Sequence, residues 1–89
     1  MKNKKIITIM VAGKNGTGKY TVSYLLKEFF ETKGFEVNLA ANQDFSTEKD
    51  FLKTIGDNIE DRVSAVNKKT KLYIKEVPLS RYNFDDFLK

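Results

Sequence analysis

The sequence predicts a small α/β fold of the order β-α-β-α-β, a three-layer sandwich with a mostly parallel three-stranded sheet between helices. Three observations support this prediction. An apolar run over residues 6–12 precedes a glycine-rich stretch, and an amphipathic segment follows that stretch. Two later strand-like segments then alternate with a second helical pattern. The 89 residues are expected to form a single domain over residues 1–89, with residues 79–89 as a C-terminal extension.

The first predicted strand and helix lie on either side of the glycine-rich stretch. Residues 5–12 are apolar almost throughout, which is typical of a strand covered on both faces, so we place this strand at the centre of the sheet. Residues 21–33 carry apolar side chains at helical spacing, and Phe29 and Phe30 among them are assigned to the core. Gly34 is a signal for the end of this helix.

The second predicted strand covers residues 35–41 and alternates between apolar and polar side chains, which favours an outer position in the sheet. Asp44 follows this strand. In a parallel sheet the carboxyl ends of neighbouring strands meet at one edge, where ligands bind. Asp44 is therefore the candidate residue for holding Mg²⁺ through water or for contacting a ligand. The alternative is that Asp44 only forms a turn.

The second half of the chain contains one more helical pattern and one more strand pattern. Thr47 and Asp50 have the spacing of a capping box at a helix start. Gly56 weakens this helix by about 1 kcal/mol relative to Ala, so either a kink or two short helices are expected. Residues 71–77 form the third predicted strand, which Pro78 ends. Glu76 on this strand is the candidate for a second acidic residue that positions metal or water.

Composition excludes several classes of chemistry. The chain has no cysteine and no histidine, which rules out disulfides, thiolate metal sites and acid–base catalysis by histidine. Sixteen Lys and Arg against twelve Asp and Glu give a net charge of +4, which suits a lysine-rich surface or a polyanionic ligand. Arginines and aromatic residues do not cluster, so nucleic acid is not an expected partner. No stretch approaches the roughly 18 apolar residues of a membrane span, and a cytoplasmic location is expected.

The stretch between the first strand and the first helix carries the chemistry. It reads Gly13-Lys14-Asn15-Gly16-Thr17-Gly18-Lys19-Tyr20-Thr21. Glycines at this spacing let backbone N–H groups surround an anion, and the helix start that follows adds a partial positive charge. The alternative is a turn that only joins strand to helix, for which one or two glycines are enough. The order of strand, glycine-rich loop and helix predicts a site for nucleotide phosphates.

This stretch resembles the P-loop, or Walker A motif, of the NTPase superfamily, with a spacing similar to that of adenylate-kinase-like nucleotide kinases. The resemblance covers residues 5–45 and implies that the backbone from Lys14 to Lys19 holds the β-phosphate. It also implies that Lys19, the candidate catalytic residue, bridges the β- and γ-phosphates, and that Thr21 bonds the α-phosphate side. Tyr20 occupies the usual position of a Mg²⁺-ligating hydroxyl, and its phenol is too long for direct ligation. The layout is also similar to that of short, uncharacterised bacteriophage P-loop proteins. The candidate phosphate-binding residues are Gly13, Lys14, Asn15, Gly16, Thr17, Gly18, Lys19, Tyr20 and Thr21.

The expected function is binding of a nucleoside di- or triphosphate, ATP or GTP, with Mg²⁺ as an expected companion and with weak or no turnover. One alternative is a small NTPase or kinase-like phosphotransferase that oligomerisation completes, with Lys14, Lys19 and Arg81 as its cations. Another is an interaction protein with a relic P-loop that acts on a host process if the chain belongs to a phage. Exposed sheet edges and the apolar residues of the tail favour a homodimer or a protein partner.

Overall fold

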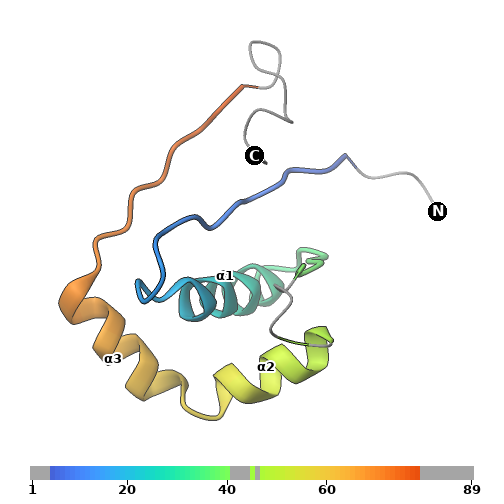
Figure 1. The fold of residues 1–89 in the computed structure, drawn as a ribbon. Coiled ribbons are helices and arrows are strands. Elements are labelled where there is room, and N and C mark those ends of the chain that lie inside the picture. The colour runs from blue at the N-terminus through green and yellow to red at the C-terminus, as the bar shows by residue number, and fades with distance from the viewer. Residues whose placement is uncertain (1–4, 41–44, 46, 79–89) are drawn as a thin grey trace.

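The structure, a computed structural model, describes residues 5–40, 45 and 47–78. It contains three helices in this part of the chain: α1 (Lys19–Thr32), α2 (Glu48–Gly56) and α3 (Ile59–Lys69). α1 packs against both of the other helices. Figure 1 shows α2 and α3 as an arc along one side of α1, with the glycine-rich loop at the end of α1 that lies beside α3.

The described residues contain no β-strand, so the prediction of an α/β P-loop sandwich with strand one at its centre is wrong. Residues 5–12, 35–40 and 71–78, which cover the described parts of the three predicted strands, are chain without regular secondary structure. In Figure 1 residues 5–12 and 71–78 run as extended arms away from the loop and from α3. An alternating or apolar pattern shows that a segment suits a sheet, but it does not supply the partner strand that a sheet requires.

The position of α3 explains why the third predicted strand does not pair in parallel with the first. Thr70, the residue after α3, donates a hydrogen bond from its hydroxyl to the Thr17 carbonyl at 2.8 Å. Residues 71–78 therefore start beside the loop, where residues 5–12 end. Parallel strands start at the same end of a sheet, and these two segments start at opposite ends. The described backbone hydrogen bonds include none between the two arms.

α1 begins at Lys19, two residues before the predicted start. The prediction that this helix ends near Gly34 is confirmed. Gly34 has a φ of 90° and donates its N–H to the Glu31 carbonyl, while Phe35 donates to the Phe30 carbonyl at 3.1 Å. This pair of bonds is the Schellman motif, in which a glycine takes the left-handed conformation. The rings of Phe30 and Phe35 lie 5.5 Å apart and add the apolar contact that often accompanies it.

The second helical pattern forms two short helices, which was one of the two expectations for Gly56. α2 ends at Gly56 and α3 starts at Ile59. The predicted cap of the first is confirmed, since the Thr47 hydroxyl accepts the Asp50 N–H at 3.0 Å. A Cβ at Gly56 would lie 2.9 Å from the Tyr24 hydroxyl, so the missing side chain also lets α2 approach α1.

The core of the described residues is small and lies between α1 and α2. Phe51 and Ile55 are each only 1% exposed. Tyr20 packs edge-on against Phe51 at 5.8 Å and against Phe45 at 5.2 Å between ring centroids. Phe29 does not belong to this core as predicted, because 55% of its surface is exposed.

A buried lysine ties α1 to two other segments. The Lys27 ammonium lies 2.7 Å from Glu31 and 2.8 Å from Glu48, and it donates to the Val37 carbonyl at 3.2 Å. Burial alone would lower the pKa of Lys27, but the hydrogen bonds and charges of the two carboxylates outweigh burial, so its pKa is raised. This network joins α1 to α2 and to residues 35–40 without a sheet.

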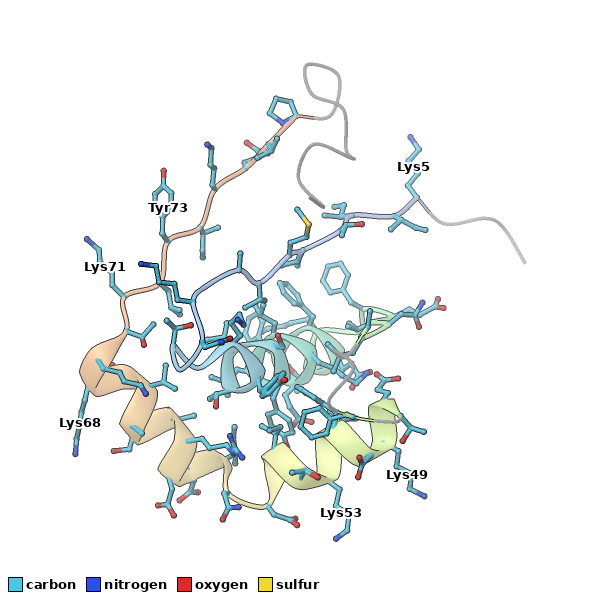
Figure 2. All side chains as sticks on the ribbon, viewed as in Figure 1. Lys5, Lys49, Lys53, Lys68, Lys71 and Tyr73 are labelled. Carbon is cyan, nitrogen blue, oxygen red and sulfur yellow. The ribbon has the colours of Figure 1, made fainter. Side chains whose placement is uncertain are left out.

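The remaining charged side chains lie mainly at the surface. Figure 2 labels several side chains that point away from the helices: Lys5, Lys49, Lys53, Lys68, Lys71 and Tyr73. Asp57, Glu60 and Asp61 are also exposed.

Candidate functional site

The glycine-rich loop turns back on itself before α1. Thr17 donates both its N–H and its hydroxyl to the Lys14 carbonyl, at 3.3 and 2.8 Å. Gly16 is the third residue of this turn and has a φ of 83°, the positive value that a type II turn requires at that position. A Cβ at Gly13 would lie 2.7 Å from the Thr17 hydroxyl, so Gly13 lets the chain close on itself.

α1 begins in a way that leaves its N-terminal end open to an anion. Its hydrogen-bond ladder starts with the Val22 N–H, which donates to the Gly18 carbonyl at 3.1 Å, so the amides of the first turn point out of the helix end. Gly18 is the N-cap residue, with a φ of 100°, and no side chain caps the helix. The first turn also has no acidic residue. Both features favour a negatively charged ligand at this helix start.

The Lys19 ammonium lies within the loop. It donates a hydrogen bond to the Gly13 carbonyl at 2.7 Å. This contact closes the loop across its base and uses one of the three N–H groups of the ammonium. The other two N–H groups are available for phosphate oxygens.

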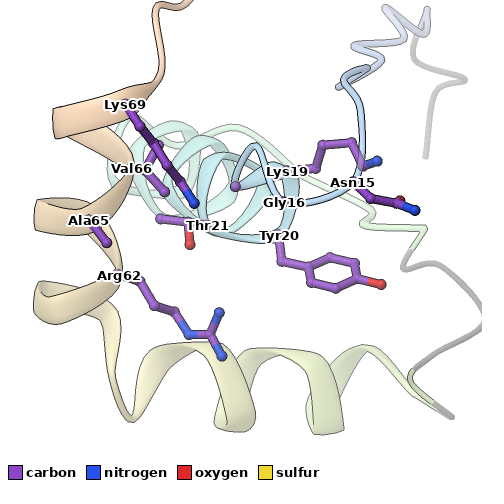
Figure 3. A pocket seen from close by; sticks show the side chains of 10 residues that line it. Asn15, Gly16, Lys19, Tyr20, Thr21, Arg62, Ala65, Val66 and Lys69 are labelled. Atoms are coloured by element: carbon purple, nitrogen blue, oxygen red, sulfur yellow. The ribbon is translucent and has the colours of Figure 1, made fainter.

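A pocket of about 360 Å³ lies between the loop, the start of α1 and α3 (Figure 3). Six of the nine predicted phosphate-binding residues line it: Asn15, Gly16, Gly18, Lys19, Tyr20 and Thr21. The other three, Gly13, Lys14 and Thr17, form the turn behind the pocket and do not line it. The loop residues predicted from sequence are therefore brought together around one hollow.

The other predicted site residues are not at this pocket or cannot be placed. Glu76 is exposed on the arm 71–78 and does not line the pocket. Asp44, the candidate Mg²⁺ ligand, and Arg81, a candidate cation, lie outside the described residues. Within the described part of the chain, no group of three or more acidic side chains is arranged to hold a metal ion.

α3 supplies a wall of the pocket that the sequence analysis missed. Arg62, Ala65, Val66 and Lys69 line it, and this spacing of i, i+3, i+4 and i+7 places them on one helical face. No acidic side chain lines the pocket, whereas Lys19, Arg62 and Lys69 are cationic. The described residues offer none of these three cations a carboxylate partner within ion-pair distance. The available signal was the spacing of Arg62 and Lys69, which places both on one face of a helix.

α3 is held against the loop by a direct contact. A Cβ at Gly18 would lie 2.4 Å from a methyl carbon of Val66, so the two can only pack together because residue 18 is glycine. The hydrogen bond from Thr70 to Thr17 fixes the far end of α3 to the same loop. The loop and the cationic face of α3 are thus parts of one packed unit.

No family model, curated protein or solved structure matches this chain. The site is therefore interpreted from its own geometry, and the P-loop resemblance stays a prediction. Among the described residues, none of the helices combines the length and the apolar character needed to cross a membrane.

Proposed function

We propose that this chain binds the phosphates of a nucleoside di- or triphosphate, ATP or GTP, with weak or no turnover. The observation that carries the proposal is the convergence of an uncapped helix start, a glycine turn and three cations on one pocket without acidic residues. Amides at a helix N-terminus and lysine or arginine side chains are the groups that hold phosphate in proteins.

The affinity that follows is modest. Charge-assisted hydrogen bonds contribute about 1.5–3 kcal/mol each, so four to six of them give roughly 6–18 kcal/mol before the costs of binding. Ordering the ligand and the exposed loop offsets much of this. A dissociation constant in the micromolar range, near 8 kcal/mol, is the expected result.

Binding is favoured over catalysis because the described residues do not bring together at the pocket the parts needed for phosphoryl transfer. Transfer needs a positioned metal and a residue that orients the attacking group. Glu76 is exposed on an arm and does not line the pocket, and Tyr20 packs its ring into the aromatic cluster. An NTPase or kinase-like activity remains the alternative that steady release of phosphate would reveal.

Isothermal titration calorimetry tests the proposal. ATP, GTP, ADP and inorganic phosphate are titrated into the protein with and without Mg²⁺. Lys19→Ala should weaken ATP binding about 10-fold or more, the equivalent of one charge-assisted hydrogen bond. Lys68→Ala is the matched control, because Lys68 is exposed on α3 and does not line the pocket. Absence of heat with every ligand, or equal loss in both variants, would exclude a phosphate site at the loop.

The two arms support a second proposal, self-association into a homodimer. They carry large apolar side chains that the described residues leave 45–92% exposed: Ile6, Ile7, Ile9, Met10, Leu72, Tyr73 and Ile74. If a fully exposed side chain presents about 100 Å², the exposed fractions of these seven give roughly 500 Å² of apolar surface. Each partner of a stable interface buries about 800 Å², so this surface is a large part of one. A second copy would cover this surface with matching segments. Sedimentation velocity at increasing protein concentration tests the dimer, and a monomer at all concentrations contradicts it.

A further inference from the structure

The cationic face of α3 suggests which phosphate ligands the pocket selects. Arg62 and Lys69 are seven residues apart on α3, on the same helical face as Val66, and all three line the pocket. Figure 3 shows Lys69 reaching from α3 toward Thr21, and Arg62 reaching from the same side of α3 into the space below Thr21 and Tyr20. Lys19 belongs to the loop and α1, so the pocket has cations on two different walls.

Arg62 has a hydrogen-bond donor without an acceptor. Its Nε atom is buried and has no hydrogen-bond partner in the described part of the structure. A buried donor without an acceptor costs about 1–3 kcal/mol, and more when the group is charged, so such groups are rare unless a ligand or water meets them. The Arg62 side chain is already in place, because the contact of Val66 with Gly18 and the bond from Thr70 hold α3 against the loop.

Thr21 places a hydroxyl at the same pocket. It is only 3% exposed, lines the pocket, and makes no side-chain hydrogen bond to another described residue. A hydroxyl can donate to a phosphate oxygen. The unpaired Nε–H of Arg62 and the hydroxyl of Thr21 belong to residues that line one pocket, and both groups can donate to the oxygens of a phosphate ligand.

We infer that Arg62 is a ligand-binding residue and that, with Lys69, it makes the pocket selective for nucleoside polyphosphates over monophosphates. This inference rests on the proposed function. The helix start and Lys19 suffice for one phosphate group, whereas cations on the opposite wall gain a partner only when the ligand carries further phosphates. A triphosphate or diphosphate can engage both walls, and a monophosphate engages one. Arg62 is suited to this role because its fork of donors matches the oxygens of a phosphate.

Calorimetry with ATP, ADP and AMP tests the selectivity. The intact protein should bind ATP most tightly and AMP most weakly. Arg62→Gln should weaken ATP binding about 10- to 100-fold and AMP binding by less than about 3-fold, so that discrimination largely disappears. Arg62→Lys keeps the charge without the fork and should lie between the two. Lys68→Gln removes one charge from the same helix off the pocket and should leave all three affinities unchanged.

A second measurement observes Arg62 in the intact protein and uses a variant only to assign its signal. The guanidinium Nε–H of Arg62 gives its own NMR signal, which is told apart from that of Arg81 by its loss in Arg62→Lys. This signal should shift on addition of ATP to the intact protein and stay unchanged with AMP. If ATP binds and depends on Lys19 while the Arg62 signal does not move, or if Arg62→Gln weakens ATP and AMP equally, the inference is wrong and the proposed function stands. If the intact protein binds no nucleotide at all, the proposed function itself fails.

Discussion

Substituting Gly18 tests how α3 is held against the loop, and Gly16 provides the matched control. Both glycines have positive φ, 100° and 83°. A Cβ at Gly18 would lie 2.4 Å from Val66, whereas a Cβ at Gly16 would meet nothing within 4 Å. Gly16→Ala therefore measures backbone strain alone, and Gly18→Ala measures strain together with a clash between the loop and α3.

The expected magnitudes follow from these two terms. An L-residue in the left-handed region costs about 1–2 kcal/mol, which is the full effect expected for Gly16→Ala. Overpacking a close contact adds about 1–3 kcal/mol, so Gly18→Ala should lower the free energy of unfolding by roughly 2–5 kcal/mol. Val66→Ala removes the methyl groups that cause the clash. In the Val66→Ala background, Gly18→Ala should lower the free energy of unfolding by only about 1–2 kcal/mol, the cost of backbone strain alone.

The assay is urea unfolding followed by far-ultraviolet circular dichroism, with the free energies taken from the midpoints and slopes. In the double-mutant cycle, Gly18→Ala should cost less free energy of unfolding when residue 66 is alanine than when it is valine. Equal destabilisation by Gly16→Ala and Gly18→Ala, or no rescue by Val66→Ala, would mean that α3 does not pack on the loop.

Three further predictions concern the rest of the fold. Lys27→Met should lower the free energy of unfolding by about 2–3 kcal/mol, measured by urea unfolding, because it removes charge-assisted bonds to partly exposed partners. Because folding raises the pKa of Lys27, the contribution of Lys27 to the free energy of unfolding is fully present below its unfolded-state pKa. This contribution is lost above about pH 10, as pH rises through the raised pKa of the folded state. If the intact protein loses no more stability in this range than Lys27→Met does, the prediction is wrong. Thr47→Ala removes the cap of α2 and should cost about 1 kcal/mol, with a drop in thermal midpoint, whereas Thr47→Ser should be nearly neutral. Ile7→Lys and Ile74→Lys place charges on the exposed arms and should shift sedimentation from dimer to monomer, while Lys75→Glu should not if apolar contact drives association.

Local features of the fold were predicted well because they depend on residues close together in the sequence. The Thr47 cap needs only a hydroxyl and an N–H three residues later, and the left-handed Gly34 needs only the absence of a Cβ. The break near Gly56 follows from helix propensity. Each of these is settled within one or two turns of chain.

The sheet was predicted wrongly because strand patterns describe compatibility and not pairing. Residues 5–12 suit a buried strand, but a strand forms only when a partner meets it in register. The Thr70–Thr17 bond brings together residues that are 53 positions apart, and no local pattern encodes it. The buried Lys27 was missed for the same reason, since its partner Glu48 comes from a different helix.

The lining of the candidate pocket was predicted in part. The loop residues are contiguous, so the motif alone identified the six that line the pocket. Arg62 and Lys69 lie on a helix more than 40 positions away, and their place at the pocket depends on how α3 packs. Gly18 contributes both to the loop and to the packing of α3, because it is the residue at the start of α1 and leaves room for Val66.

The central claim is that loop amides and Arg62 surround the same phosphate ligand, and a ¹⁵N-resolved NMR titration with ATP tests it most directly. We predict that the backbone amides of residues 15–21 and the Nε–H of Arg62 shift together along one saturation curve, and that Lys19→Ala moves this curve to ATP concentrations about 10-fold higher or more. Shifts confined to residues away from the loop, or an unchanged spectrum at millimolar ATP, would contradict the account.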